Sequence, residues 1–311
     1  MPTLLVENHD GLLHKMPLGH PEQIARLEAV FAALSAPAFD ALARVEAPEA
    51  TEDDLLLCHP PGHIATIRAS IPQSGLAAID ADTSVSPGSW NAALKGVGGC
   101  LHAVDQVLSD AARNAFVATR PPGHHAEGTR PMGFCLFGNI AIAAKHALKR
   151  HGLSRVAVVD FDVHHGNGTQ NLLWDEARVL FISTHQMPLY PGTGAPGECG
   201  AAGTILNLPL NPGTGEAEMR QVYASRVLPG LESFGPELVL ISAGFDAHRA
   251  DPLASLAWET EDFVWITRQL CALANRHCRG RVVSALEGGY DLSALAASVA
   301  AHVMVLMEQT G

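Results

Sequence analysis

The chain contains several short, continuously apolar segments of the kind that form strands buried on both faces. These segments lack the alternation of polar and apolar positions that marks a strand with one solvated face. Amphipathic helical patterns lie between them. The apolar segments span residues 3–7, 115–119, 155–160, 179–183, 204–210, 237–242 and 281–286. The helical patterns span residues 21–34, 60–69, 89–109, 138–150, 216–233, 259–276 and 291–308.

This regular alternation of strand and helix predicts an α/β fold with a parallel sheet covered by helices on both faces. We expect one domain over residues 1–311, because 47% of the residues are apolar and 17% are charged, which is enough for a large core. In sheets of this kind, ligands bind beyond the carboxyl ends of the strands.

Four predicted strands run directly into loops that combine glycine with histidine, aspartate or tyrosine. The loops read "RPPGHHAEG", "FDVHHGNGT", "AGFDAHRADP" and "EGGYDL". Glycine lets a backbone come close to a bound ligand. Because the carboxyl ends of parallel strands share one edge of a sheet, the sequence predicts a common site there.

Asp162 and His164 are two residues apart in an extended segment, so their side chains are expected to face the same point. Asp246, at the end of another predicted strand, offers a third donor. Two carboxylates and one imidazole with an open position are typical of a catalytic Zn²⁺ site, with Fe²⁺, Co²⁺ or Mn²⁺ as alternatives. Aspartates in turns and a hydrogen-bonded histidine would explain one such loop, but four together favour a metal.

Asp160, His124, His125 and Tyr290 lie in the same loops. A buried Asp160 needs a partner, and a histidine ring would be oriented by it. A histidine can transfer protons near neutral pH, and a tyrosine hydroxyl can stabilise an oxyanion. Taken singly, each residue is equally typical of an ordinary turn or a buried core.

Six motifs occur in an order that resembles the histone deacetylase and acetylpolyamine amidohydrolase superfamily, closest to its class II-like bacterial members. They are "RPPGHH", "GFCLF", "VVDFDVHHGNGTQ", "PGTG", "LVLISAGFDAH" and "LEGGYDL". The resemblance implies an arginase/deacetylase-like fold around an eight-stranded parallel sheet. It also implies one Zn²⁺ per chain, held by Asp162, His164 and Asp246. The implied reaction is removal of acetyl or short acyl groups from acetyl-lysine-like N-acyl amines by a metal-activated water, which releases acetate.

The resemblance also assigns roles to residues around the metal. His125 would serve as general base and then acid, and His124 would be its electrostatic companion, oriented by Asp160. Tyr290 would donate to the oxyanion. Asn167 stands where class I relatives carry an aspartate, as the partner of the second histidine.

By the same resemblance, Phe134 and Tyr190 would flank the aliphatic stem of the substrate, and the carbonyl of Gly133 would accept the hydrogen bond of the scissile amide. Asp82 matches a rim position that binds the substrate backbone, although a turn-forming aspartate fits equally well. Leu253 aligns with a gatekeeper that is acidic in a polyamine-specific branch. Its apolar side chain favours acyl-lysine over a cationic polyamine.

Two further expectations concern buried polar groups. The family pattern places a structural K⁺ near Asp160, Asp162, His164, Ser183 and Thr184, largely through carbonyl oxygens. Arg26 would lie either at the foot of the pocket, where acetate leaves, or on a helix surface.

The net charge of −12 argues against binding to nucleic acid. The first residues lack the pattern of a signal peptide, and no run reaches the ~18 apolar residues of a membrane span. We therefore expect a cytoplasmic protein without a membrane partner, whose substrate is a small-molecule or peptide N-acyl amine, and which is compatible with a homo-oligomer. The alternatives are an acetylpolyamine amidohydrolase, an arginase-type manganese hydrolase, which needs more acidic ligands, and a non-catalytic acyl-amine-binding protein.

Overall fold

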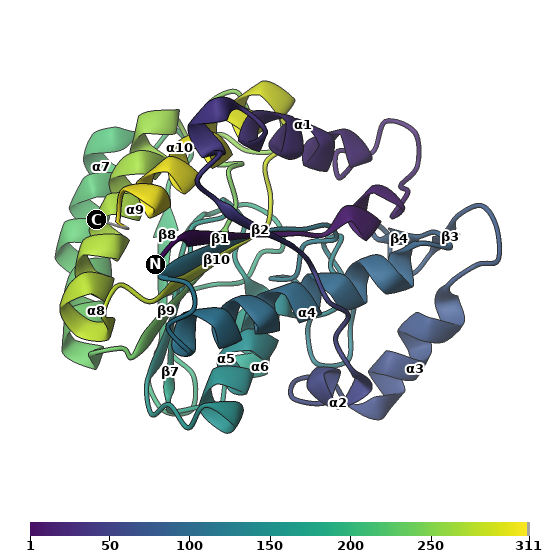
Figure 1. Cartoon of the computed structure of the whole chain (residues 1–311), viewed down its shortest axis with the longest axis horizontal. Coiled ribbons are helices and arrows are strands. Elements are labelled where there is room, and N and C mark those ends of the chain that lie inside the picture. Colours follow the sequence, from purple (N-terminus) through teal and green to yellow (C-terminus); the bar gives the residue numbers. More distant parts are fainter. Residues whose placement is uncertain (310–311) are drawn as a thin grey trace.

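A computed structural model of the protein describes residues 1–309, and its centre is an eight-stranded sheet in which every neighbouring pair is parallel. The strand order is β2-β1-β5-β10-β9-β6-β7-β8 (Figure 1). The strands are β1 (Thr3–Glu7), β2 (Ala43–Glu46), β5 (Asn114–Ala118), β6 (Val156–Asp160), β7 (Val179–Gln186), β8 (Ile205–Leu210), β9 (Leu238–Ala243) and β10 (Val282–Leu286). The predicted eight-stranded parallel sheet is confirmed.

Helices cover both faces of this sheet, as predicted (Figure 1). One face carries α2 (Glu52–Leu55), α3 (Pro61–Ser70), α4 (Ser89–Leu108), α5 (Asn139–Arg150) and α6 (Asn167–Leu173). The other face carries α1 (Ile24–Leu34), α7 (Glu216–Val222), α8 (Leu228–Phe234), α9 (Thr260–Cys278) and α10 (Leu292–Glu308). A short antiparallel pair, β3 (Ala77–Ala78) and β4 (Ser84–Val85), lies outside the main sheet.

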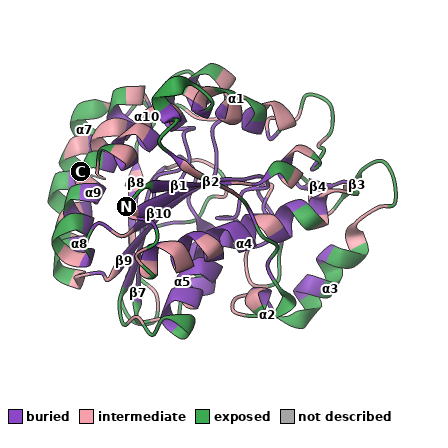
Figure 2. Cartoon of the chain, in the orientation of Figure 1, coloured by how far each residue is buried: buried purple, intermediate pink, exposed green. Residues whose placement is uncertain are grey.

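The core has two halves because successive side chains of a strand point to opposite faces. In β6, Ala157 and Val159 pack with α1, α9 and α10, whereas Val156 and Val158 pack with α4 and α5. Figure 2 shows the strands buried between helices whose outer surfaces are exposed. Burial on both faces explains why these strands are apolar throughout rather than alternating.

The short elements α2, β3 and β4 were not expected from the sequence, and three larger elements also differ from the expectation. Strand β2 was not expected, because it is an edge strand in which half-buried and exposed positions alternate. Helix α6 begins within the polar, glycine-rich segment "HHGNGTQ", which resembles a loop. The helix expected over 216–233 contains a π-helical segment, Tyr223–Val227, between α7 and α8. Asp291 caps the N-terminus of α10, since its side chain accepts a hydrogen bond of 2.8 Å from the backbone N–H of Ala294.

The sheet order brings the four polar strand ends together. Strands β5, β10, β9 and β6 are consecutive neighbours in the centre of the sheet, and each precedes one of the four loops. Their carboxyl ends therefore form one continuous edge. Within residues 1–309, none of the helices has the length and hydropathy that crossing a bilayer requires.

Candidate metal centre and active site

Asp162, His164 and Asp246 converge at this edge. Asp162 and His164 follow β6, and Asp246 follows the neighbouring strand β9. Nδ1 of His164 lies 3.1 Å from Oδ1 of Asp162 and 3.1 Å from Oδ2 of Asp246. All three side chains are buried. The structure therefore brings together the three donors that the sequence singled out.

The surroundings of these donors favour a bound cation. Although burial opposes its charge, His164 has its pKa raised to about 10 by hydrogen bonds to Asp162 and Asp246. Burial raises the pKa of Asp246 to about 7. A positive charge between the two carboxylates is thus strongly stabilised, and a divalent metal ion would meet the same need.

Glycine at two strand ends makes room for the carboxylates. A Cβ atom on Gly288 would overlap Oδ2 of Asp246 and lie 2.5 Å from Oδ2 of Asp162. A Cβ atom on Gly244 would overlap the same Asp162 oxygen. The donor types and this cradle fit Zn²⁺ or a similar divalent ion.

Two adjacent histidines are held by different partners. Nδ1 of His124 lies 3.0 Å from Oδ2 of Asp160, and Nδ1 of His125 lies 2.7 Å from Oδ1 of Asn167. Because the amide nitrogen of Asn167 donates to Glu127 at 2.8 Å, its oxygen is the atom that faces His125. His125 must then carry its proton on Nδ1, which leaves the lone pair of Nε2 free to accept a proton.

The electrostatic surroundings of the two rings differ. Burial, together with the neighbouring His124 and His164, holds the pKa of His125 well below its usual range. Burial also opposes charge on His124, but Asp162 and Asp160 outweigh it and raise its pKa well above the usual value. Burial raises the pKa of Tyr290 as well, so its hydroxyl stays protonated and can donate.

Arg26 lies beneath Tyr290 and is buried, so it does not occupy the helix surface that was one of the two positions expected for it. Its guanidinium donates to the carbonyl oxygens of Glu287 and Gly289, both at 2.6 Å, and lies 4.8 Å from the centre of the Tyr290 ring. The side chain is fully buried. Arg26 therefore holds the glycine-rich loop that carries Tyr290.

A pocket of about 220 Å³ opens beside these groups. It contains every residue expected to contact substrate, and Leu189 in addition. Its lining consists of Asp82, His125, Gly133, Phe134, His164, Leu189, Tyr190, Leu253 and Tyr290. A larger cavity of about 720 Å³ lies elsewhere and contains none of these groups, so the smaller pocket is the candidate substrate site.

The wall that carries Phe134 is a tight turn with strained backbone. Met132 and Cys135 exchange backbone hydrogen bonds of 3.2 and 3.0 Å, and Gly133 and Phe134 between them have φ of 55° and 69°. A turn with two positive φ values disfavours a bulky residue at either position. Asp82 accepts a hydrogen bond of 3.2 Å from the N–H of Gly133, which anchors this turn at the rim.

The residues expected around K⁺ have protein partners. Ser183 lies beside Asp160 in the sheet, and its hydroxyl is 3.0 Å from Nδ1 of His185. The hydroxyl of Thr184 is 3.1 Å from that of Tyr223. The potassium site stays a prediction.

Two acidic residues that support the site were not singled out from the sequence. Glu287 accepts backbone hydrogen bonds from Gly123 at 2.6 Å and His124 at 3.2 Å. Asp251 accepts one of 2.6 Å from the N–H of Tyr290. Glu287 directly follows the buried strand β10, just as Asp162 lies close after the buried strand β6. The position of Glu287 was therefore a usable signal in the sequence. Asp251 lies in a turn and offered none.

Comparison with known proteins identifies the family. The sequence model described as "Histone deacetylase domain" matches residues 20–306. This chain belongs to the histone deacetylase family. A "Probable deacetylase" from Archaeoglobus fulgidus is 39% identical over 298 residues, which cover 94% of this chain and 82% of that protein. "Polyamine deacetylase HDAC10" from Homo sapiens is 37% identical over 326 residues, which cover 99% of this chain and 48% of that protein.

A solved structure agrees with this assignment. The crystal structure of the HDA15 HD domain superposes with a TM-score of 0.93 at 34% identity, covering 99% of this chain and 89% of that one. The deacetylase-like fold that the motifs implied is confirmed, and the family makes the protein a hydrolase.

Proposed function

We propose that this protein is a zinc-dependent amidohydrolase that removes acetyl or other short acyl groups from acetyl-lysine-like N-acyl amines. The observation that carries the proposal is the convergence of Asp162, His164 and Asp246 beside a narrow pocket that His125 and Tyr290 also line. Metal donors, a proton acceptor and a hydroxyl donor thus meet where an amide can enter. This is the set of groups that amide hydrolysis requires.

Each group has a role that follows from its position. A Zn²⁺ ion held by Asp162, His164 and Asp246 would supply Lewis-acid polarisation of the acyl carbonyl and a water acidic enough to react near neutral pH. His125 takes the proton of the attacking water on Nε2 and delivers it to the nitrogen as the C–N bond breaks. The products are acetate and the free amine.

The remaining groups stabilise negative charge. The Tyr290 hydroxyl donates to the carbonyl oxygen as that oxygen becomes anionic. His124, held by Asp160 at 3.0 Å, adds positive charge beside the reacting centre. Asn167 keeps His125 in the tautomer that this proton transfer needs.

The pocket lining favours an acyl-lysine over a polyamine. Phe134, Tyr190 and Leu253 give it aromatic and apolar walls, which suit an aliphatic stem. The carboxylate of Asp82 at the rim suits the backbone N–H groups of a peptide. Leu253 offers no charge to the second ammonium of a polyamine.

The test is a comparison of two substrates with the zinc-loaded protein. We expect a higher kcat/KM for a fluorogenic acetyl-lysine peptide than for N-acetylputrescine. A clear preference for N-acetylputrescine would overturn the substrate class, and no hydrolysis of either would overturn the proposed activity.

Two tyrosine variants test the assigned chemistry. Tyr290→Phe is expected to lower kcat by roughly 10²–10³-fold, the usual cost of removing an oxyanion donor. Tyr223→Phe is the matched control, because Tyr223 is also buried but does not line the pocket. Equal activity of the two variants, with circular dichroism showing both folded, would refute the role of Tyr290.

A further inference from the structure

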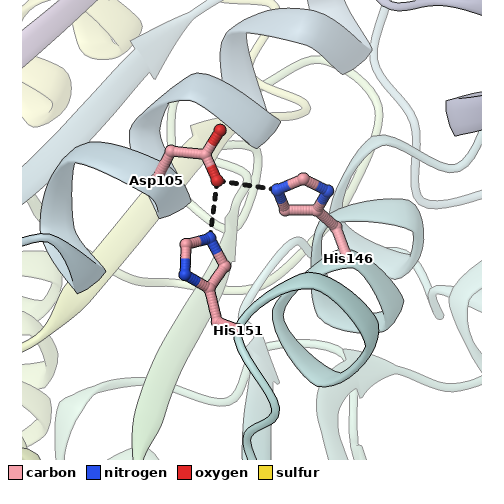
Figure 3. Close-up of side chains that lie close together, drawn as sticks. All are labelled: Asp105, His146 and His151. Carbon is pink, nitrogen blue, oxygen red and sulfur yellow. Dashed lines mark hydrogen bonds and ion pairs between the residues drawn. The ribbon is translucent and has the colours of Figure 1, made fainter.

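Asp105, His146 and His151 form a second cluster of metal-binding side chains, separate from the candidate active site. Asp105 lies in the last turns of α4, His146 lies on α5, and His151 directly follows α5. Figure 3 shows both rings directed at the same carboxylate oxygen. Nε2 of His146 lies 2.7 Å and Nε2 of His151 lies 2.6 Å from Oδ1 of Asp105.

The cluster lies at the opposite edge of the sheet from the active site. Helix α4 leads into β5 and α5 leads into β6, so the ends of these two helices lie where the strands begin. Asp162 follows the carboxyl end of β6 instead. Among the residues that the structure describes, these are the two groups of three side chains with donor atoms close enough to share a metal ion.

A cavity of about 720 Å³ gives this cluster access to solvent. Asp105 and His146 line it, together with His102, which lies one helical turn before Asp105. The charged side chains of the lining are mixed: Glu49, Asp53, Asp54, Lys149 and Arg150. Long-range attraction of a cation is therefore weak here, and affinity must come from the donors themselves.

The donors suit a divalent transition metal. Two imidazole nitrogens and a carboxylate oxygen form a ligand set that Zn²⁺ and Co²⁺ accept, with water or His102 in the fourth position. All three donor atoms lie within 4.8 Å of one another. We propose that Asp105, His146 and His151 bind a second divalent metal ion, which links α4 to α5.

Binding requires only a small rearrangement. In a tetrahedral zinc site the N···O separation is about 3.3 Å, so each present hydrogen bond would lengthen by roughly 0.6 Å. The side chain of Asp105 is 45% exposed and that of His151 is 25% exposed, which leaves both free to turn. His146 is 9% exposed and packs in the helix interface, so it provides a fixed donor.

The same three side chains would otherwise form only a hydrogen-bonded ion pair. Such exposed pairs contribute little to stability, and one imidazole would suffice for that purpose. The distinguishing property of the cluster is that two imidazoles, one on α5 and one at its C-terminal cap, meet one carboxylate oxygen from α4. Metal uptake therefore separates the two interpretations.

The experiment counts metal ions. The folded protein is dialysed against micromolar Zn²⁺ at neutral pH, and bound zinc is measured by elemental analysis. We expect about two zinc ions per chain in the wild type and one fewer in His151→Gln and in Asp105→Asn, with deacetylase activity retained in both. When the protein is loaded with Co²⁺ instead, the visible absorption of both variants should be lower than that of the wild type by the contribution of one cobalt ion. At 100-fold excess over Kd, zinc bound at this cluster should raise Tm by roughly 4 °C, and this increment should be absent from the variants.

His277→Gln is the matched control. His277 is 23% exposed and pairs with the carboxylate of Glu232, yet it has no second imidazole beside that carboxylate. It should keep the full zinc content. The proposal is wrong if His151→Gln and Asp105→Asn, both folded by circular dichroism, bind as much zinc as the wild type.

A variant of the other cluster keeps this test independent of the proposed function. Asp246→Asn should lose the zinc ion at the active site and keep the zinc ion bound by Asp105, His146 and His151. If Asp246→Asn retains no zinc at all, the cluster at α4 and α5 does not bind it.

Discussion

Gly288 is the position where a single methyl group most directly disturbs the candidate metal site without removing a donor. Its N–H donates to Oδ2 of Asp162 at 2.8 Å. A Cβ atom there would overlap Oδ2 of Asp246, lie 2.5 Å from Oδ2 of Asp162 and lie 2.7 Å from Cγ of Asp246. Because ordinary contacts of a Cβ atom begin near 3.4 Å, at least one carboxylate must move by about 1 Å in Gly288→Ala.

The size of the effect follows from this displacement. Disturbing the surroundings of metal ligands typically costs about 10–100-fold in metal affinity. Misplacing reacting groups by about 1 Å costs on the order of 100-fold in rate. We therefore expect Gly288→Ala to bind zinc 10–100-fold more weakly and, when saturated with zinc, to hydrolyse the acetyl-lysine peptide about 100-fold more slowly.

The assay is zinc affinity by competition with a chromophoric chelator, followed by kcat at saturating zinc. Gly62→Ala is the control, because a Cβ atom on Gly62 in α3 meets nothing within 4 Å. It should leave both quantities unchanged. Wild-type zinc affinity and kcat in Gly288→Ala would refute the packing argument and, with it, the placement of the metal between Asp162 and Asp246.

Three further predictions concern other residues. Burial lowers the pKa of His302 to about 3. Below about pH 6.5 this histidine is therefore protonated in the unfolded chain but stays neutral in the folded chain. The stability that this provides is complete above pH 6.5 and is lost as the pH falls toward 3. In urea unfolding, the free energy of unfolding of the wild type minus that of His302→Leu should fall by roughly 2 kcal/mol between pH 7 and pH 5. A difference that stays constant with pH would contradict this. Leu253→Glu places a carboxylate in the pocket lining. It should raise the ratio of kcat/KM for N-acetylputrescine to kcat/KM for the acetyl-lysine peptide by roughly tenfold, whereas Leu253→Gln should not. The same ratio in both variants would argue against Leu253 as a selectivity residue. Asn167→Ala removes the acceptor that lies 2.7 Å from Nδ1 of His125 and should lower kcat by roughly 10–100-fold, with recovery in Asn167→Asp; an unchanged kcat would show that the tautomer of His125 is fixed by other means.

The sequence was most informative where one physical rule acted alone. Continuous apolar runs predicted the buried strands, and the carboxyl-edge rule predicted a shared site for the loops that contain Asp162, Asp246 and Tyr290. The apolar runs do not reveal the order of the strands in the sheet. This order makes β5, β10, β9 and β6 neighbours. The motif resemblance supplied that part, because it rests on the family's fold rather than on periodicity.

The features that the sequence left open or missed depend on contacts between distant segments, not on one local rule. Arg26 is buried because the carbonyls of Glu287 and Gly289 meet it across the fold. Asp105 and His151 are far apart along the chain, and the packing of α4 against α5 brings them together. No local pattern marks such residues, so only coordinates can find them.

The central claim is that Asp162, His164 and Asp246 share one divalent metal ion. Anomalous diffraction from crystals of the zinc-loaded protein, recorded on both sides of the zinc absorption edge, tests this most directly. We predict a peak bonded to a carboxylate oxygen of Asp162, Nδ1 of His164 and a carboxylate oxygen of Asp246. A map without anomalous density between these three side chains would contradict the account.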